Sequence, residues 1–330
     1  MQAVRIGAET SDLLPITKGV PQGSILGPLM FNIFINDLPS TPLNSKLESY
    51  VDDSKLFLSF RVRELQDVVT MVNKDLFTIV TYLCNNSLLA NPGKTKIMFF
   101  GTPRMLKQIP VNTSFMFLGE IIHPVQNAKD LGLIMDSTLS FDEHIKQAVS
   151  SCMKKLHQIN RIKNLFAPKT LEMIIQTCVF SKLFYCSSVW SSTSRKNISK
   201  LQTVQNFAAR ILTGTRKYDH ITPVLEQLKW LPVEKTLYLR DCVMAYKCLN
   251  NSLPDYLCQK FITRSEISNR VTRQSNQLHK PLCRTSTAEK YFLYRASTLW
   301  NDLHESFKSK SSVLSFKYNL KKTFFNDLSN

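Results

Sequence analysis

Two adjacent carboxylates at one turn are the residues of this sequence best suited to catalysis. Asp52 and Asp53 follow Tyr50 and Val51, and segment 47–60 has the pattern of a hairpin whose turn is 51–53. Carboxylate oxygens are the ligands that Mg²⁺ prefers, and Mg²⁺ beside nucleic acid indicates phosphoryl transfer. An Asp–Asp pair is also ordinary turn chemistry, so the pair taken alone leaves a structural role open.

The elements around this turn alternate between strand and helix, and the second half is almost entirely helical. Strands are expected over 4–16, 47–60, 95–100, 115–123 and 129–135, which would complete one sheet, with helices over 24–36 and 63–89. Further helices are expected over 142–166, 168–186, 195–213, 233–250, 289–306 and 313–327. Segment 264–286 is polar and weakly periodic, which favours a mobile loop. The predicted fold class is α+β.

The positive charge of this chain lies almost wholly in its helical part. The net charge is +17, yet residues 1–140 hold equal numbers of basic and acidic side chains. Between His144 and Tyr218, 13 basic residues face a single acid, Glu172. Such an excess indicates a polyanion such as nucleic acid, bound through phosphate contacts, although a solvated surface that favours solubility is the alternative.

The cysteines and the apolar stretches indicate the cellular compartment and whether the chain can span a membrane. The eight cysteines are scattered and include no Cys-x-x-Cys pair, so buried free thiols in a reducing compartment are favoured over a zinc site. The longest apolar stretch, 25–35, is too short to span a bilayer. We therefore expect a soluble, intracellular protein with no membrane partner.

Several short motifs follow one another in an order that is known from one family of polymerases. They are Gly19–Ser24 (GVPQGS), Leu26–Pro28 (LGP), Ile35–Leu38 (INDL), Tyr50–Asp53 (YVDD), Asn91–Thr95 (NPGKT), Asp130–Asp136 (DLGLIMD), Ala245–Asn250 (AYKCLN) and Ala296–Asn301 (ASTLWN). The series resembles the reverse transcriptases of LINE-type (non-LTR) retrotransposons over nearly the whole chain. The resemblance implies an incomplete reverse-transcriptase palm sheet with helices over 1–140, a basic helical thumb over 141–215 and a basic helical C-terminal region over 216–330.

The resemblance also assigns catalytic roles. It makes Asp52 the palm carboxylate that binds the two Mg²⁺ ions of the family, with Asp53 as a weaker or outer ligand. Lys94 is placed to protonate the leaving pyrophosphate or to stabilise its charge, and an ordinary solvated lysine is an equal alternative.

Nucleic-acid contacts are implied for six further residues. Gln22 and Gly23 match the loop that contacts the template and the incoming nucleotide, and Tyr50 and Val51 would border the primer end. Leu131 and Gly132 would hold the primer backbone, and ordinary strand packing is the alternative role for this pair.

The basic thumb helix is the third part of the implied site. Its apolar stripe is Ile145, Val149, Cys152, Leu156 and Ile159. The basic residues expected to face a nucleic-acid backbone are Lys146, Lys154, Lys155, Arg161 and Lys163. The three tryptophans Trp190, Trp230 and Trp300 are expected to pack between helices more readily than to stack on bases.

One departure from the family pattern limits the expected activity. In the family, another Asp upstream of the loop that matches 19–23 binds both metals, whereas here the sole upstream aspartate is Asp12, in a polar turn. We therefore expect an N-terminally truncated reverse transcriptase domain, with Mg²⁺ bound poorly and no activity unless another polypeptide supplies the missing palm and fingers. The expected partners are an RNA template and an RNA/DNA duplex. The alternatives are a non-catalytic RNA- or DNA-binding remnant and a decayed reading frame.

Overall fold

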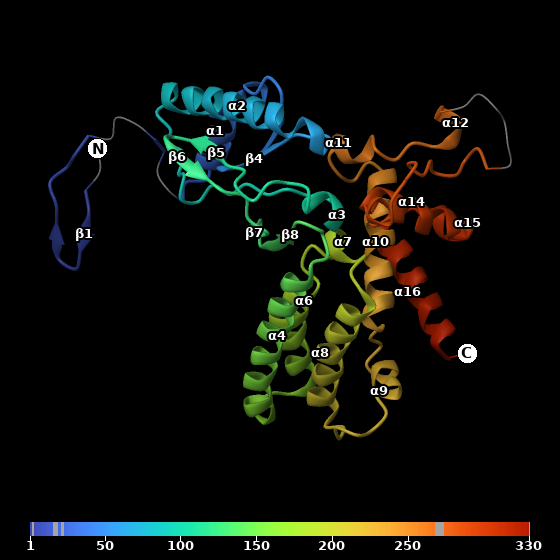
Figure 1. Ribbon diagram of the computed structural model, residues 1–330. Coiled ribbons are helices and arrows are strands. Elements are labelled where there is room, and N and C mark those ends of the chain that lie inside the picture. The colour runs from blue at the N-terminus through green and yellow to red at the C-terminus, as the bar shows by residue number, and fades with distance from the viewer. Residues whose placement is uncertain (2, 16–18, 21–22, 268–273, 330) are drawn as a thin grey trace. The chain divides into compact units, whose positions relative to one another are not determined.

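The computed structural model describes residues 1, 3–15, 19–20, 23–267 and 274–329, which belong to two compact units (Figure 1). The first unit comprises residues 1–99 and 103–125, and the second comprises 100–102 and 126–330. Both contain helices and strands, so the chain is α+β, and the second unit is mainly helical.

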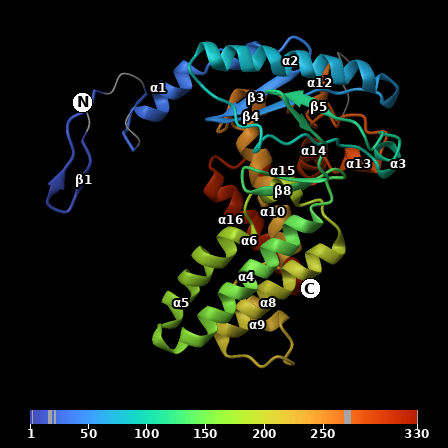
Figure 2. The same cartoon turned by 60° about the vertical axis from the view of Figure 1, so that its left-hand side comes forward.

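The first unit is built from short strands and one long helix. Its strands are β1 (Arg5–Ile6), β2 (Glu9–Thr10), β3 (Lys46–Tyr50), β4 (Asp53–Phe57), β5 (Phe115–Phe117) and β6 (Glu120–Ile122). Its α-helices are α1 (Gly27–Phe34), α2 (Leu65–Asn85) and α3 (Pro103–Leu106), with 3₁₀ turns at Leu38–Ser40 and Val62–Glu64. Helix α2 runs beside strand β5 in Figures 1 and 2, and the backbone N–H of Met116 donates to Asn73 Oδ1 over 3.0 Å.

A small core holds the β3–β4 hairpin against helix α2. Leu47 of β3 and Ile79 of α2 pack with Ile35 and Leu38, which follow α1. The fully buried carboxylate of Asp75 on α2 also holds the segment before β3. It accepts hydrogen bonds from the backbone N–H groups of Leu43 and Asn44 at 2.9 and 3.1 Å. Burying this carboxylate is tolerable because several donors compensate for its lost hydration.

The predicted single palm sheet is wrong for the described residues. They form four separate two-stranded antiparallel sheets, and segments 115–123 and 129–135 are each a hairpin in place of one strand. The reason is local: Leu118 and Gly119, and likewise Leu131 and Gly132, all have positive φ, which is the pattern of a two-residue type I′ hairpin turn. The predicted strand over 95–100 is reduced to one bridge between Ile97 and Pro124.

The second unit consists of one hairpin and a set of packed helices. Its strands are β7 (Asn127–Asp130) and β8 (Leu133–Asp136). Its helices are α4 (Asp142–Ile162), α5 (Pro168–Ile175), α6 (Ser181–Leu183), α7 (Ser187–Trp190), α8 (Arg195–Thr213), α9 (Thr222–Gln227), α10 (Val233–Leu249), α11 (Asp255–Cys258), α12 (Arg264–Ile267), α13 (Ser286–Glu289), α14 (Phe292–Asp302), α15 (Glu305–Lys308) and α16 (Val313–Ser329). A 3₁₀ turn covers Lys163–Leu165, and a π-helical turn over Gln176–Phe180 joins α5 to α6.

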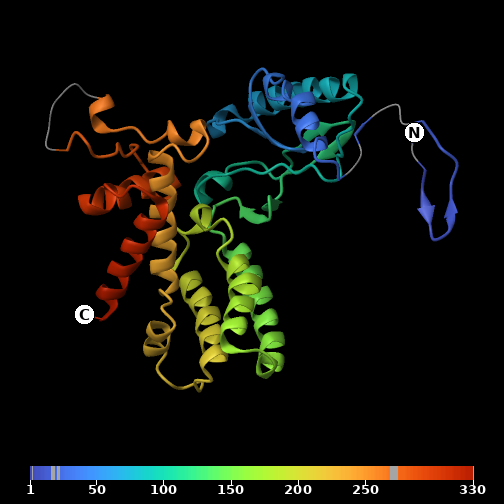
Figure 3. The ribbon, with the colours of Figure 1, turned by 180° about the vertical axis from the view of Figure 1, so that it is seen from behind.

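Two apolar cores organise these helices. Helices α4 and α8 lie side by side in Figures 1 and 2, and the predicted stripe on α4 is buried there, with Cys152 and Leu156 fully inaccessible. The second core joins α10, α14 and α16 around Tyr246, Trp300 and Phe316, as Figure 3 shows from the back. All three tryptophans are buried, which confirms their packing role.

Part of the segment expected to be a mobile loop is anchored. Leu278 is almost fully buried, and its backbone N–H and C=O bond to the side-chain amide of Asn301 at 2.8 and 3.0 Å. Leu278 thereby joins the second core, and a bridge to Thr263 holds the same backbone. None of the helices in the described residues combines the length and apolar character that crossing a bilayer requires.

Candidate nucleic-acid and metal site

Asp52 and Asp53 lie at the end of the β3–β4 hairpin, which confirms the hairpin predicted from the sequence. Tyr50 pairs with Asp53, so Val51 and Asp52 form a two-residue turn. Val51 has φ of 57°, a left-handed conformation that is a genuine outlier for a β-branched residue. A left-handed conformation at a β-branched residue carries backbone strain, and both aspartates beside it are exposed.

These carboxylates are available to a ligand. Asp52 and Asp53 are exposed, and neither side-chain carboxylate takes part in a hydrogen bond or ion pair with the described residues. As ligands of a divalent cation they form a partial set, because in the described part of the chain no three Asp, Glu, His or Cys residues gather in a metal-binding arrangement. Mg²⁺ is commonly held by one or two carboxylates plus water and substrate phosphates, so the pair fits part of such a site.

The other residues predicted to serve this site are placed separately. Gln22 lies outside the described residues. Gly23 is exposed, with φ of 83° and open space around the position of a Cβ. Lys94 is exposed at the end of a turn in which its N–H donates to the side chain of Asn91 over 3.2 Å. No hydrogen bond or ion pair among the described residues joins Lys94 to the aspartates, so its predicted role stays a prediction.

The β7–β8 hairpin is held by side chains from the helices that follow it. Tyr185, which lies between α6 and α7, donates from its hydroxyl to the carbonyl of Leu131 over 2.9 Å. A carbon of the Tyr185 ring lies 3.2 Å from where a Cβ on Gly132 would be, so a larger residue would require the ring to shift, and the φ of 86° also favours glycine. At the other end, the N–H of Ile134 donates to Nδ1 of His144 on α4 over 3.4 Å. The tip of this hairpin is therefore positioned by the helical unit.

Changing Tyr185 to Phe is expected to loosen this tip while keeping the ring. The variant should lose about 1 kcal/mol of unfolding free energy, because it removes one hydrogen bond at a partly exposed position. Amide hydrogen exchange should speed up over 128–135 and stay unchanged in α8. Tyr218→Phe, at a tyrosine that is 92% exposed, is the matched control and should change neither quantity. Unchanged exchange in Tyr185→Phe would contradict the anchoring role.

The basic residues predicted on α4 divide into free and engaged groups. Lys154 and Arg161 are exposed on the face opposite the buried stripe. Lys155 donates to the carbonyl of Cys178 over 3.1 Å, so it ties α4 to the π-helical turn. Lys163 is half-buried in the 3₁₀ turn after α4.

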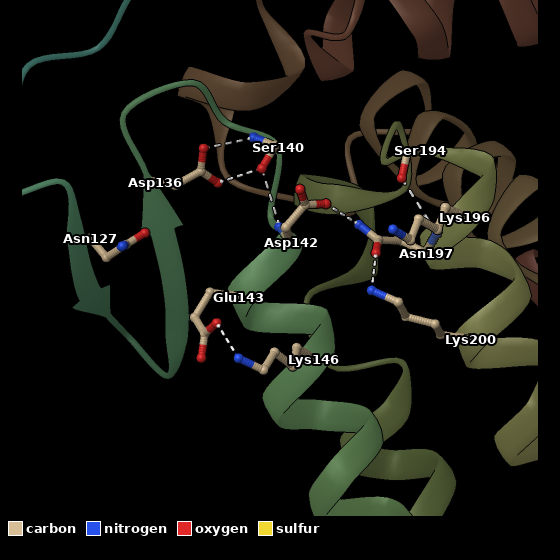
Figure 4. A pocket seen from close by; sticks show the side chains of 10 residues that line it. All are labelled: Asn127, Asp136, Ser140, Asp142, Glu143, Lys146, Ser194, Lys196, Asn197 and Lys200. Carbon is tan, nitrogen blue, oxygen red and sulfur yellow. Dashed lines mark hydrogen bonds and ion pairs between the residues drawn. The ribbon is translucent and has the colours of Figure 1, made fainter.

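A pocket that sequence reasoning did not predict lies beside the hairpin (Figure 4). It has a volume of about 360 Å³ between the first turns of α4 and α8, and its cations are Lys146, Lys196 and Lys200. Its acids are engaged: Glu143 accepts from Lys146 over 3.4 Å, and Asp142 accepts from the amide of Asn197. The sequence signal for it is the group of basic residues in 195–200, which belongs to the positive charge that indicates a polyanion.

Asp136 organises the strained loop between this hairpin and α4. Leu139 and Phe141 both have positive φ, at 53° and 59°. The Asp136 carboxylate accepts from the N–H groups of Thr138, Ser140 and Phe141 at 3.1, 3.0 and 2.6 Å. Burial raises the pKa of Asp136, but these hydrogen bonds outweigh burial and hold the pKa below its ordinary value.

Comparisons with known proteins find matches to one family of polymerases. Residues 2–122 match the family described as reverse transcriptase (RNA-dependent DNA polymerase). The chain is 29% identical, over 66% of its length, to a probable RNA-directed DNA polymerase from transposon BS of Drosophila melanogaster. It is 22% identical, over 84% of its length, to the RNA-directed DNA polymerase from mobile element jockey of the same species. Residues 2–122 thus match a reverse transcriptase domain, and these relatives are RNA-directed DNA polymerases of non-LTR retrotransposons.

The match to the reverse transcriptase family includes the Tyr50–Asp53 hairpin, and the jockey alignment, at 84% of the chain, reaches the helical unit. This chain covers 25% of the transposon BS protein and 31% of the jockey protein, so it spans about a quarter to a third of these curated relatives. No solved structure gives a significant match. Reverse transcriptases as a family use divalent metal ions and bind RNA templates.

Proposed function

We propose that this reverse transcriptase domain serves RNA-directed DNA synthesis, with Asp52 and Asp53 as ligands of divalent metal. The observation that carries the proposal is the strained hairpin turn: a β-branched residue at φ of 57° presents two exposed carboxylates within the segment that matches the family.

In this proposal the palm portion is 1–140, the thumb is 141–215 and the C-terminal region is 216–330. The β7–β8 hairpin holds the primer backbone near Leu131 and Gly132, and Lys154 and Arg161 contact phosphates of the template–primer duplex. Two features support the assignment. The hairpin tip is fixed by Tyr185, and the exposed cations of α4 lie opposite a fully buried apolar stripe. A rigid helix with one basic face is suited to follow a regular phosphate backbone.

The second candidate function is nucleic-acid binding without catalysis. The observation that favours it is the small number of metal ligands: the described residues bring two adjacent carboxylates to the hairpin, with no third metal-ligating residue grouped beside them. The basic helices would bind nucleic acid equally well in either case.

Primer extension on an RNA template with Mg²⁺ tests the proposal. Changing Asp52 to Asn is expected to reduce extension at least about a thousandfold, because the parts of a catalytic unit act together. The affinity for template–primer should stay equal or rise, since one negative charge is removed. Asp67→Asn, at an exposed carboxylate in the first turn of α2, is the matched control and should leave extension unchanged.

The outcomes separate the two candidates. Extension that Asp52→Asn leaves intact would contradict the proposed role of the hairpin. Absence of extension in the unsubstituted chain, with salt-sensitive RNA binding in the same preparation, would favour the binding function. Gln substitutions of Lys154 and Arg161 should weaken that binding in either case.

A further inference from the structure

Two lysines of α16, together with one lysine whose charge acts on one of them, form a cationic group that is called the lysine surface below. Lys317 and Lys321 are one turn apart on α16, and Lys229 lies in the connection between α9 and α10. Helices α10 and α16 lie side by side in Figures 1 and 3. Lys235, on the first turn of α10, flanks the group, with its ammonium 5.4 Å from the ring centre of Phe324 on α16.

The charges of this surface are not neutralised by the protein. Within the described residues, none of these lysine side chains forms an ion pair with a carboxylate. The one acid that acts on Lys321 is Glu172, and its carboxylate already accepts a hydrogen bond from the indole N–H of Trp230 over 3.2 Å. Burial, together with the positive charges of Lys317 and Lys229, lowers the pKa of Lys321. Folding therefore holds like charges together against their repulsion.

An exposed aromatic side chain lies on the same side of α16. Tyr318 is 69% exposed, and the spacings of three and four residues place Leu314, Lys317, Tyr318 and Lys321 on one face of the helix. The opposite face is fixed in the second core by Phe316 and Leu320, which are fully buried. The helix is thus held in place with Lys317 and Tyr318 exposed, whereas Lys321 is half-buried with its ammonium 5.5 Å from the ring centre of Phe325.

Cations beside an exposed ring are what a single-stranded nucleic acid recognises, because phosphates contact the lysines and a base stacks on the ring. We propose that the lysine surface, with Tyr318, is a binding site for single-stranded nucleic acid, separate from the contacts of α4 with duplex. The inference shares only its class of ligand with the proposed function, and neither Asp52 nor the β3–β4 hairpin contributes to it.

Fluorescence anisotropy with a labelled 20-nucleotide single-stranded RNA of mixed sequence tests this site. The full chain is compared with the Lys317→Gln/Lys321→Gln variant across a salt series. Affinity at about 0.1 M salt should fall about ten- to thirtyfold, and the slope of log affinity against log salt should decrease by about 1.4, as expected for two lost phosphate contacts on a single strand. Tyr318→Ala should weaken binding about tenfold through lost stacking, and Tyr318→Phe should bind like the unsubstituted chain.

The control removes the same number of charges elsewhere on the unit. Lys260→Gln/Lys290→Gln changes two lysines that are exposed, and it should leave affinity and slope nearly unchanged. An equal loss in this control would show that only net charge matters and would overturn the proposal. Tighter binding of anionic phosphatidylserine vesicles than of RNA, lost in the same Lys317/Lys321 variant, would overturn it as well.

The result also separates this site from the proposed function. A loss confined to variants at Lys154 and Arg161, with full affinity in the Lys317/Lys321 variant, would leave the thumb assignment standing and exclude the lysine surface. The reverse result would support the lysine surface and count against the α4 contacts. Circular dichroism melting of each variant shows that the helical unit remains folded, which is expected because all the changed lysines reach solvent.

Discussion

Replacing Arg295 by Met is expected to lower the free energy of unfolding of the helical unit by about 3–5 kcal/mol, because a buried carboxylate loses its countercharge. Arg295 on α14 contacts Asp241 on α10 over 3.2 Å, and their side chains are only 15% and 4% exposed. The same guanidinium group donates to the carbonyl of Ser188 over 2.8 Å and to the hydroxyl of Ser191 over 2.7 Å. This group therefore joins α14 to α7 and α10.

The destabilisation should depend on pH with a defined sign. Burial raises the pKa of Asp241 above its ordinary value even though Arg295 acts to lower it. Without Arg295 the pKa should rise further. A carboxyl group whose pKa is higher in the folded state supports folding below its unfolded pKa, and this support is lost as pH rises through the folded value. The variant should thus lose most stability near neutral pH and recover part of it in acid, as chemical denaturation at several pH values will measure.

The matched variant removes both charges. Asp241→Asn/Arg295→Met should be more stable at neutral pH than Arg295→Met alone, since no unpaired charge remains buried. If Arg295→Met and the double variant were equally stable, with no dependence on pH, the cost would come from lost packing and the charge argument would be refuted.

Replacing Asp136 by Ala is expected to cost about 2–4 kcal/mol, because several donors to a partly buried carboxylate lose their acceptor together. The three N–H groups and the hydroxyls of Thr138 and Ser140 all converge on this carboxylate. They hold a loop that contains two non-glycine residues at positive φ. The first turn of α4 and the wall of the neighbouring pocket should therefore become less ordered. Thermal melting and amide exchange over 137–145 will measure both effects.

The contribution of Asp136 to stability changes with pH in the opposite direction to that of Asp241. Its pKa is lowered in the folded state, so its contribution is present above the unfolded pKa and is lost as pH falls through the folded value. The difference in stability between the unsubstituted chain and Asp136→Ala should shrink below about pH 4, the ordinary aspartate range. Glu226→Ala, at an exposed carboxylate on α9, is the control and should change stability by less than about 0.5 kcal/mol. A pH-independent difference for Asp136→Ala would rule out the hydrogen-bonding role.

The local features of this protein were predictable because their causes are local. The apolar stripe on α4 repeats with the helical period, and the structure buries it as predicted. Asp52 and Asp53 lie between two alternating segments, and the structure places Asp52 in the hairpin turn and Asp53 at the start of β4. The number of strands predicted over 115–123 and 129–135 is wrong for a local reason. Leu118–Gly119 and Leu131–Gly132 form turns inside segments whose pattern predicts single strands.

The amino-acid sequence by itself determined the family, the α+β class, the paired carboxylates and the concentration of positive charge in the helical part. Only the tertiary structure decided which charged groups are free to act. Lys155 is engaged by a carbonyl 23 residues away, Asp241 is buried with Arg295, and Lys229 is placed beside Lys317 and Lys321. These partners are distant in the chain, and whether a charge is neutralised or exposed depends on packing between helices, which no local sequence period encodes.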